Sequence, residues 1–424
     1  MDWLLKLAFD QLVERGSLII RAPSGRTLTF GNGQGAPVAI RFVDRRAALA
    51  LILDPDLKLG ELYMDGRLVV EQGDIYDFLE LVHDQPAGLR KPLLGRLLDR
   101  ARLALRWLSH RNGAARSRRN VAHHYDLDGR LYDLFLDSDR QYSCAYYESP
   151  EATLEEAQSA KRRHVAAKLA LRPGDRVLDI GCGWGGLGLY LAGTAGAGEV
   201  LGVTLSEEQF ATAQRRAKEA GLDDAVRFEM RDYRAVEGRF DRIVSVGMFE
   251  HVGLHNQRTF FDKCKSLLTE DGVMLLHTIG LSDGPWFTNP WIDKYIFPGG
   301  HLPALSELLP WIEKSGLVLT DVEILRLHYA STLRDWRERF MARRDEAVKL
   351  YDERFCRMWE FYLAGCEAAF RWRNVVVFQL QLARRQDAAP LTRNYIEQAE
   401  DALRRAEAEA GRAVRPEGRR LASV

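Results

Sequence analysis

The sequence predicts an α/β protein built around a Rossmann-like sheet, preceded by a smaller α+β domain. Residues 177–180 have the apolar pattern of a short buried strand, and an acid, Asp179, lies near its end. A turn with the spacing G-x-G-x-x-G follows at Gly181, Gly183 and Gly186, and an apolar helical pattern begins directly after it. Strand and helix patterns then alternate along the chain, as in a doubly wound α/β fold.

The residues after the second predicted strand distinguish between nucleotide-type ligands. A dinucleotide-binding fold is expected to carry an acid there, about 20 residues beyond the glycines, to hold the ribose hydroxyls. Here the strand at residues 199–203 ends in Thr204-Leu205-Ser206 instead. This favours S-adenosylmethionine over NAD, because its methyltransferases also need a close backbone turn but bind no pyrophosphate. A glycine turn that binds nothing is the third interpretation, since the glycine spacing alone is a weak signal.

Length and composition exclude several classes of protein. The chain has 424 residues, which suggests two or three domains, and a formal net charge of zero, which gives no indication of nucleic-acid binding. Its five cysteines are scattered without zinc-ligand spacing, so we expect no metal site, no disulfide framework and a cytoplasmic setting. Charges at Lys6 and Asp10 argue against a signal peptide, and without a long apolar run we expect no membrane span.

Residues 1–87 are predicted to form the smaller α+β domain. Alternating apolar residues at 17–20 and 27–30 flank Pro23-Ser24-Gly25, a pattern typical of a β-hairpin. No catalytic combination of side chains is present in this part of the sequence. We therefore expect a scaffold, lipid-binding or dimerisation role, with a homodimer as one expected assembly. A further strand and two helices are expected at residues 38–43, 45–53 and 74–82.

Residues 88–119 have a strongly basic composition, with Asp99 as the single acid among ten basic side chains. Apolar residues recur among them near helical spacing. A basic amphipathic helix of this kind suits an anionic bilayer surface, where apolar side chains enter the headgroup region and arginines meet phosphates. A solvated linker helix packed on the next domain explains the pattern equally well. The basic residues are Arg90, Lys91, Arg96, Arg100, Arg102, Arg106, Arg111, Arg116, Arg118 and Arg119. The apolar residues at helical spacing are Leu93, Leu97, Ala101, Leu105 and Leu108.

Residues 120–384 are predicted to form the catalytic body. Three polar residues, Asp232, Glu250 and His277, follow or end successive predicted strands. Because ligands of such sheets bind beyond the carboxyl ends of the strands, we expect these side chains beside the glycine turn. Two of the three could instead support the fold. The predicted helices cover residues 151–171 and 207–220, and the predicted strands cover 226–230, 240–246, 272–277, 317–324 and 374–382.

Two later stretches are unusually aromatic. Residues 284–315 are rich in Trp, Pro and Gly, which predicts a helical lid or pocket wall. Residues 331–370 form a long helical pattern with regularly spaced aromatic residues, which suits either plain core or the wall of a channel for an acyl chain. The tail at residues 385–424 alternates Glu, Arg and Ala, a pattern typical of a solvated helix with no part in a pocket.

These motifs together resemble the cyclopropane-fatty-acid synthase family, including its mycolic acid relatives. The matching stretches cover the predicted catalytic body in order, and Gly60-Glu61-Leu62-Tyr63-Met64-Asp65-Gly66 extends the match into the N-terminal domain. The tail lies outside the match. The other stretches that carry the resemblance include Gln141-Tyr142-Ser143-Cys144-Ala145-Tyr146, Val177 to Gly186, Asp232-Tyr233-Arg234, Phe240 to Gly253, and Tyr329-Ala330-Ser331-Thr332-Leu333.

The resemblance implies a class I S-adenosylmethionine methyltransferase domain with a helical lid insertion. It implies an enzyme at the inner face of the membrane that adds a methylene group to cis double bonds in phospholipid acyl chains. The residues that would bind the cofactor are Tyr142, Ser143, Asp179, Gly181, Gly183, Gly185, Thr204, Gln209, Asp232 and Tyr233.

The resemblance also implies a bound bicarbonate ion that removes a proton so that the ring closes. Its binding residues would be Cys144, Glu250, His277, Tyr329 and the backbone of Ile279. Cys366 matches a cysteine once favoured in the family as a nucleophile, although the reaction requires no thioether intermediate.

Three alternatives remain at this point. The same first step could yield a methyl- or methylene-branched chain, the acceptor could be a small soluble molecule, or the protein could bind lipid without catalysis.

Overall fold

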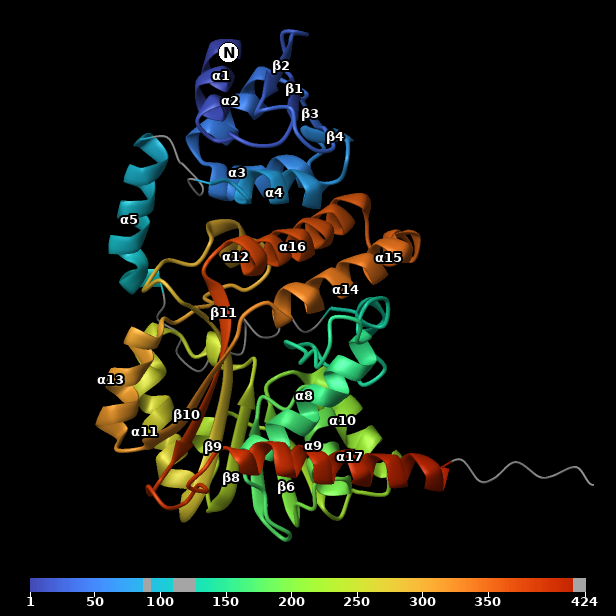
Figure 1. The fold of residues 1–424 in the computed structure, drawn as a ribbon, viewed down its shortest axis with the longest axis vertical. Coiled ribbons are helices and arrows are strands. Elements are labelled where there is room, and N and C mark those ends of the chain that lie inside the picture. The colour runs from blue at the N-terminus through green and yellow to red at the C-terminus, as the bar shows by residue number, and fades with distance from the viewer. Residues whose placement is uncertain (87–92, 110–126, 415–424) are drawn as a thin grey trace, which may run out of the picture.

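A computed structural model describes residues 1–86, 93–109 and 127–414 of the chain. Its larger part is a seven-stranded sheet in the order β10-β11-β9-β8-β5-β6-β7 (Figure 1). The five strands from β5 to β9 run parallel, and β11 runs antiparallel to its neighbours β9 and β10. The strands are β5 (Arg176–Ile180), β6 (Glu199–Thr204), β7 (Val226–Met230), β8 (Phe240–Val246), β9 (Leu268–Leu281), β10 (Val318–Leu325) and β11 (Val375–Ala383).

The strand order creates a switch point at the centre of the sheet. After β5 the chain builds outward through β6 and β7, then returns to the other side of β5 with β8 and β9. In such sheets a ligand crevice forms outside the carboxyl ends of the strands where the order reverses. The predicted α/β class and its Rossmann-like organisation are confirmed.

Helices cover both faces of this sheet. One apolar cluster joins α8, α9 and α10 to the sheet, and a second joins α11 and α13 to its other side. Ser206 caps α10 by accepting a hydrogen bond from the Gln209 backbone N–H at 3.4 Å. The bounds are α8 (Leu154–Lys168), α9 (Gly186–Gly193), α10 (Glu207–Glu219), α11 (Gln257–Leu267) and α13 (Leu305–Ser315).

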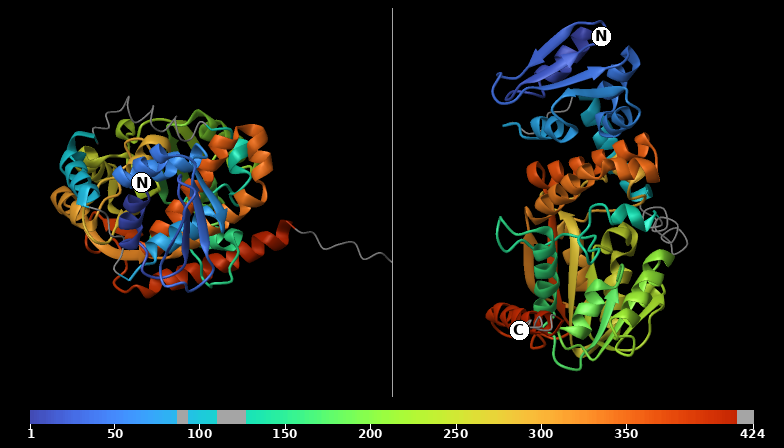
Figure 2. Two further views of the ribbon diagram at one scale, coloured as in Figure 1. Left: turned by 90° about the horizontal axis from the view of Figure 1, so that it is seen from above. Right: turned by 90° about the vertical axis from the view of Figure 1, so that its right-hand side faces the viewer.

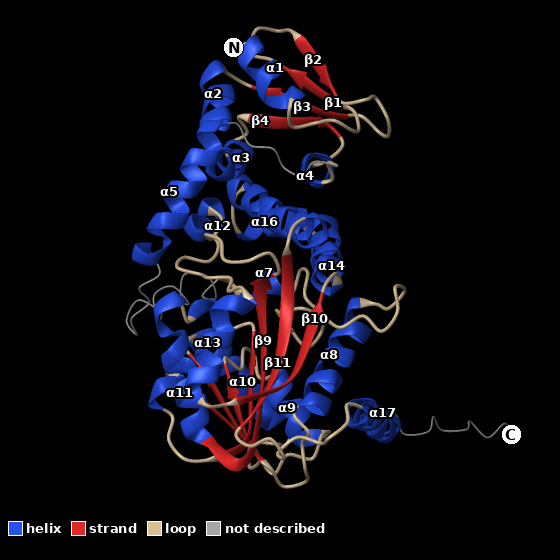
Figure 3. Ribbon diagram, turned by 60° about the vertical axis from the view of Figure 1, so that its left-hand side comes forward, coloured by secondary structure: helices blue, strands red, loops and turns tan. Residues whose placement is uncertain are grey.

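A helical layer lies beyond the carboxyl edge of the sheet, between the sheet and the N-terminal part of the chain (Figures 1 and 3). Most of it is an insertion between β10 and β11. The helical pattern predicted over residues 331–370 forms three helices there rather than one, because the chain turns at Arg343 and again at Asp352, which caps α16. The layer comprises α12 (Pro290–Tyr295), α14 (His328–Ala342), α15 (Arg344–Leu350) and α16 (Glu353–Trp372).

The aromatic stretch predicted to form a lid divides between two places. Its first helix, α12, belongs to the layer beyond the sheet edge, where Trp291 is buried. Its second helix, α13, instead packs beside α11, with Leu308 and Ile312 in the apolar cluster on that face of the sheet. The helical lid is therefore built mainly by α12, α14 and α16.

The N-terminal part, which forms the blue end of the ribbon in Figure 2, contains a four-stranded sheet in the order β2-β1-β3-β4. The predicted hairpin is confirmed, because β1 and β2 pair antiparallel. The sequence analysis missed α1, α3 and β4. The elements are α1 (Asp2–Asp10), β1 (Leu18–Arg21), β2 (Thr27–Phe30), β3 (Val38–Phe42), α2 (Arg45–Leu53), α3 (Pro55–Met64), β4 (Leu68–Gln72) and α4 (Ile75–His83).

Close packing joins this N-terminal part to the helical layer. The indole Nε1 of Trp291 lies 3.3 Å from the sulfur of Met64, and a Cβ at Gly60 would come within 2.4 Å of the same indole. One apolar cluster runs from the N-terminal sheet through α3 and α4 into α16. The boundary at residue 87 stays a prediction.

The C-terminal helix α17 (Asn394–Val414) is docked on the catalytic body, so the prediction of a solvated tail is wrong for this helix. His164 of α8 is held between two acids, with Nδ1 2.6 Å from Glu400 of α17 and Nε2 2.7 Å from Glu323 of β10. The Tyr190 hydroxyl donates to Glu407 at 2.6 Å. The acids that looked like solvated charges are acceptors for buried donors on other elements.

We predict that Glu400→Gln lowers the melting temperature by a few degrees at pH 6 and by progressively less as the pH rises to 9. Burial and the nearby Lys168 would lower the pKa of His164, but the hydrogen bonds that its ring donates to Glu323 and Glu400 outweigh them and raise it. The protonated histidine contributes its full stabilisation of the folded protein below the unfolded-state pKa of 6.5. This stabilisation is lost as the pH rises through the higher pKa of the folded state. Thermal unfolding followed across this pH range measures the difference.

Glu397→Gln is the matched control, because Glu397 is an exposed acid on the same helix. Its effect should be small and independent of pH. A Glu400→Gln effect that stays constant with pH would contradict the role given to the charged histidine.

Candidate active site

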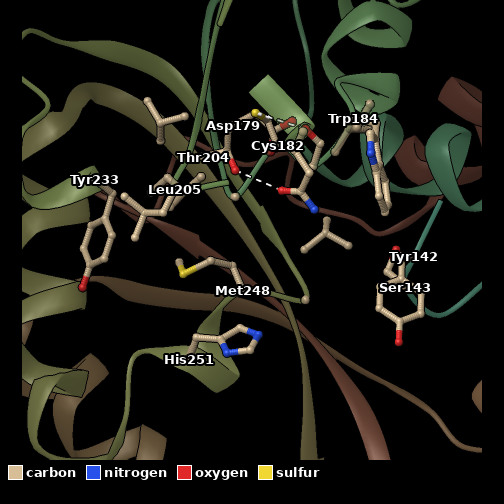
Figure 4. Close-up of a pocket in the computed structure, with 18 of the residues that line it drawn as sticks. Tyr142, Ser143, Asp179, Cys182, Trp184, Thr204, Leu205, Tyr233, Met248 and His251 are labelled. Carbon is tan, nitrogen blue, oxygen red and sulfur yellow. Dashed lines mark hydrogen bonds between the residues drawn. The ribbon is translucent and has the colours of Figure 1, made fainter. Parts of the chain in front are cut away.

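A cavity lies at the carboxyl ends of β5, β6, β7 and β8 (Figure 4). Tyr233 and Ser143 stand on opposite sides of it, and Met248 and His251 line a wall between them. Nine of the residues expected to bind the cofactor line this cavity. They are Tyr142, Ser143, Asp179, Gly181, Gly183, Thr204, Gln209, Asp232 and Tyr233.

Gly185 is expected at the cofactor but does not line the cavity, and it serves the turn instead. Its φ is +84°, and a Cβ there would come within 2.6 Å of the Phe228 ring. Gly181 has a φ of +83°, and a Cβ there would lie 2.7 Å from the Cβ of Met248. These left-handed conformations favour glycine, and they bring bare backbone to the cavity wall.

At the end of β6, where a dinucleotide-binding fold would have an acid, the polar side chains are uncharged. The Thr204 hydroxyl donates to Oε1 of Gln209 at 3.0 Å, and both side chains are buried (Figure 4). This bond leaves the amide nitrogen of Gln209 as a donor at the cavity. Farther along the wall, Asp232 is paired with Arg234 at 2.6 Å.

Asp179 is the buried acid of this cavity. Its Oδ2 has no hydrogen-bond partner within the described residues, and burial raises its pKa to about 7. A carboxyl group in this state is ready to accept a donor from a ligand.

The sequence analysis missed several cavity residues, among them Lys161, Met248 and His251. Burial lowers the pKa of His251 to about 4, so its imidazole is neutral at the wall. Lys161 is fully enclosed in α8, and so is Lys168, seven residues later. The seven-residue spacing places both lysines on the same side of an alanine-containing helix, and this was the signal available in the sequence. Lysines on a buried helix face are rare, so such a pair indicates an unusual environment.

A second polar cluster adjoins the cavity, built around Glu250 and His277. The backbone N–H of Ile279 donates to Oε1 of Glu250 at 2.7 Å, whereas its Oε2 is buried without a partner among the described residues. Burial raises the pKa of Glu250 to about 7, despite the opposing backbone hydrogen bond. This carboxyl group can therefore hold or release a proton near neutral pH.

His277 is a neutral imidazole held by an amide side chain. Burial lowers its pKa to about 3, and nearby cations add to that effect. The Gln379 amide lies 3.2 Å from Nδ1 of His277, and this hydrogen bond fixes the orientation of the ring. A neutral imidazole has one donor and one acceptor nitrogen, so Nε2 is left to bind a further polar group.

The other predicted site residues lie in the apolar interior beside these groups. Cys144 is completely buried and donates its thiol hydrogen to the Ala145 carbonyl at 3.3 Å, and burial raises its pKa. The ring of Tyr329 packs 4.7 Å from that of Phe370. Cys366 lies on α16, where burial raises its pKa to about 12, so a thiolate nucleophile is disfavoured there.

Aromatic rings pack between the cavity wall and the helical layer. The hydroxyls of Tyr142 and Tyr362 are 2.8 Å apart, which joins the cavity wall to α16. Tyr142 also stacks on Trp336 of α14 at 5.1 Å and meets the edge of Tyr132 at 5.4 Å. This side of the cavity is therefore backed by a buried aromatic layer.

Comparison with known proteins identifies the family. The family model described as mycolic acid cyclopropane synthetase matches residues 113–380. The cyclopropane-fatty-acyl-phospholipid synthase of Escherichia coli strain K12 is 40% identical over 349 residues, covering 82% of this chain and 88% of its own. The chain belongs to the mycolic acid cyclopropane synthetase family. It is thus an S-adenosylmethionine-dependent methyltransferase.

Other members of the family agree in sequence and in fold. A probable fatty acid methyltransferase of Pseudomonas putida is 43% identical over 60% of this chain and 67% of its own. The cyclopropane synthase MmaA2 of Mycobacterium tuberculosis has a TM-score of 0.60 at 36% identity, covering 63% of this chain and 98% of its own. The mycolic acid cyclopropane synthase CmaA1, in complex with SAH and CTAB, has a TM-score of 0.59 at 35% identity, with the same coverage.

The cavity suits the cofactor of this methyltransferase family. The bare turn at Gly181 and Gly183 admits a ligand closely, and the Thr204–Gln209 pair offers a neutral donor to ribose hydroxyls. Asp179 has an unpartnered oxygen for the ammonium group of the amino-acid end. The orphaned Oε2 of Glu250 likewise leaves room in the neighbouring cluster for one more polar group.

We predict that Glu250→Gln lowers kcat by roughly 10²- to 10⁴-fold, the range typical of a lost acid–base group, while S-adenosylhomocysteine still binds with a Kd within about 3-fold of wild type. Glutamine keeps the shape of the side chain but cannot exchange a proton, and Glu250 does not line the cofactor cavity. Steady-state kinetics and calorimetric titration give the two values.

Glu360→Gln is a suitable control, because Glu360 is another buried acid with a raised pKa, located on α16 near Tyr63 and Arg344. It should leave kcat nearly unchanged. Normal turnover in Glu250→Gln would remove this carboxyl group from the chemistry.

Proposed function

We propose that this methyltransferase converts cis double bonds in phospholipid acyl chains to cyclopropane rings. The observation that carries the proposal is the aromatic packing of Tyr142, Trp336 and Tyr362 at the wall of the cofactor cavity, together with the buried Glu250 carboxyl group, whose Oε2 has no partner among the described residues. The 40% identity to a cyclopropane-fatty-acyl-phospholipid synthase over most of the chain supports the same acceptor.

The aromatic layer suits the electronic demands of an alkene substrate. S-adenosylmethionine, when bound, supplies an electrophilic methyl group that the electrons of the double bond attack. The acyl chain then carries a positive charge, which water would trap as an alcohol. Tyr142, Trp336 and Tyr362 keep water out and offer ring faces that stabilise a cation. Loss of one proton from the new methyl carbon closes the ring.

The Glu250 cluster suits a small base such as bicarbonate. Bicarbonate would supply the proton acceptor, and the groups available to hold it are a ring nitrogen of His277 and the protonated form of Glu250. The backbone N–H of Ile279, which was expected to bind the ion, instead donates to Glu250. Tyr329 and Cys144 would complete the wall. A Glu250 that titrates near neutral pH can pass the proton onward.

The helix α5 (Leu93–Ser109) supports contact with an anionic bilayer. Leu97, Ala101 and Leu105 form an exposed apolar stripe at helical spacing, with Arg96 and Arg100 exposed beside it. No helix in the described ranges is long and apolar enough to cross a membrane. Contact from one side, with acyl chains drawn to the aromatic layer, fits both features.

Two of the predicted membrane-facing arginines have other partners, which corrects part of the sequence analysis. Arg102 pairs with Asp54 at 2.7 Å and Arg106 with Glu307 at 3.2 Å, so both fasten α5 to the rest of the chain. The basic residues of this segment at 90, 91, 111, 116, 118 and 119 lie outside the described residues.

A methylene-branched product is the second candidate. The tuberculostearic acid methyltransferase UfaA1 of Mycobacterium tuberculosis is 40% identical over 66% of this chain. The same cation would arise, and a hydride shift followed by loss of a proton from the new methyl carbon would leave a methylene branch. A saturated methyl branch would require a separate reductant.

Incubation with S-adenosylmethionine and monounsaturated phospholipid vesicles tests the proposal directly. We expect the lipid to gain the mass of one CH₂ group and lose its alkene, with cyclopropane protons appearing in the NMR spectrum. Vinylidene signals would establish the second candidate instead. Methylation of water-soluble acceptors with no change in the lipid would overturn both.

We also predict that Arg96→Glu with Arg100→Glu weakens binding to vesicles containing anionic lipid by about 10-fold or more. Each basic residue near such a surface contributes about 1 kcal/mol, and reversal adds repulsion. The loss should be greater at low salt, where screening is weak. Co-sedimentation with vesicles measures it.

Arg215→Glu with Lys218→Glu is the matched control, since both residues are exposed on α10, away from α5. It should retain binding. If the α5 substitutions left vesicle binding intact but dissociated a homodimer in sedimentation analysis, a second copy of the chain would be the partner of this stripe.

A further inference from the structure

Two lysines of α8 are enclosed to the same degree but differ in their charge partners. The ammonium group of Lys168 lies 2.8 Å from Glu323 and 3.2 Å from Asp321. The ammonium group of Lys161 donates to neutral oxygens only, and among the residues that the structure describes no carboxylate lies within ion-pairing distance of it. A buried cation without a counter-charge is costly, so its position calls for a compensating partner.

Lys161 faces the cofactor cavity, and so does a side chain that can carry the opposite charge. Asp179 lines the same cavity, with an oxygen that lacks a partner among the described residues. The two side chains form no ion pair with each other. Burial lowers the pKa of Lys161 to about 8 and raises that of Asp179 to about 7, as expected when neither charge is compensated.

Lys161 cannot relieve its charge by moving to solvent. Only 1% of it is exposed, and its ammonium group is bonded to the Gln141 side chain. Gln141 is fixed in turn, because its amide nitrogen donates to Asp139 at 2.7 Å, and Asp139 is paired with Arg162 at 2.8 Å. The compensating charge must therefore come to Lys161.

The link from Lys161 into the cavity is Ser143. The ammonium group donates to Oγ of Ser143 at 2.9 Å, so the hydroxyl oxygen is occupied as an acceptor. Its own hydrogen is left to be donated, and a hydroxyl polarised by a cation is a stronger donor. Ser143 lines the cavity wall, where its hydroxyl can donate to a bound ligand (Figure 4).

We propose that Lys161 is a positioning residue for the carboxylate of the amino-acid end of S-adenosylmethionine, acting through the hydroxyl of Ser143. That end of the cofactor is zwitterionic, and Asp179 takes its ammonium group. The two uncompensated charges of the cavity are thus satisfied by one ligand. This inference rests on the cofactor site and not on the identity of the lipid acceptor.

The test compares two ligands that differ in this end alone. S-adenosylhomocysteine carries the amino-acid group, and 5′-methylthioadenosine lacks it. We expect Lys161→Met to weaken binding of S-adenosylhomocysteine about 10- to 100-fold, in line with one or two charge-assisted hydrogen bonds. Binding of 5′-methylthioadenosine should change by less than about 3-fold, and calorimetric titration measures both. The loss caused by Ser143→Ala should not add fully to that of Lys161→Met, because the two residues act on the same group.

Lys168→Met is the matched control. It removes the other enclosed lysine of α8 and with it one cationic partner of both Asp321 and Glu323, so the melting temperature should fall while the ratio of the two affinities stays as in wild type. If Lys161→Met does not fold, Lys161→Gln replaces it, since glutamine keeps a donor without the charge. Equal loss of both ligands, or no loss in a folded variant, would overturn the proposal. Wild-type protein that binds neither ligand would instead refute the cofactor site itself.

Discussion

The exclusion of water at the carboxyl edge of the sheet is the constraint on which the rest of the molecule depends. The pKa shifts at Asp179, Glu250 and His277 all arise first from burial. The helices α12, α14 and α16 close this edge from above, and their aromatic rings meet the cavity wall at Tyr142. A charged methyl donor and an apolar chain can be brought together only where the surroundings are both dry and selectively polar. The fold provides this by placing a few unpaired polar atoms in an otherwise apolar interior.

The two polar clusters differ in charge, and each suits a different ligand. Lys161 and Asp179 are the buried charged groups of the cofactor cavity that make no ion pair among the described residues, whereas Glu250 and His277 nearby are close to neutral. A zwitterionic ligand suits the first, and a small ion held by neutral donors suits the second. Neither Cys144 nor Cys366 has an environment that favours a thiolate. An enclosure that receives an alkylating group is safer without one.

Much of this could be predicted from the sequence, because local patterns encode it. The strand before Gly181 and the position of Glu250 shortly after β8 follow from periodicity and from the geometry of parallel sheets. His277 was expected to end its strand, but β9 continues to Leu281, so His277 lies within the strand. The breaks between α14, α15 and α16 were missed, since the whole stretch favours helix and a single cap at Asp352 is a weak signal. The short β4 ends in polar residues and has little alternation. Lys161 was overlooked because a lysine in a helix is usually solvated, and its burial depends on contacts with a distant loop.

The docking of α17 shows the same limit on a larger scale and carries a consequence of its own. Its acid Glu400 reaches His164 across 236 residues of sequence, which no local pattern can reveal. One helix, α8, therefore presents Lys161 to the cofactor wall and, less than a turn later, His164 to the end of the chain. A force on the carboxyl terminus, such as that from a fused affinity tag or a tether to a surface, therefore acts through α17 and α8 on the wall of the cofactor cavity. Handles for purification or immobilisation are accordingly better attached to the amino terminus.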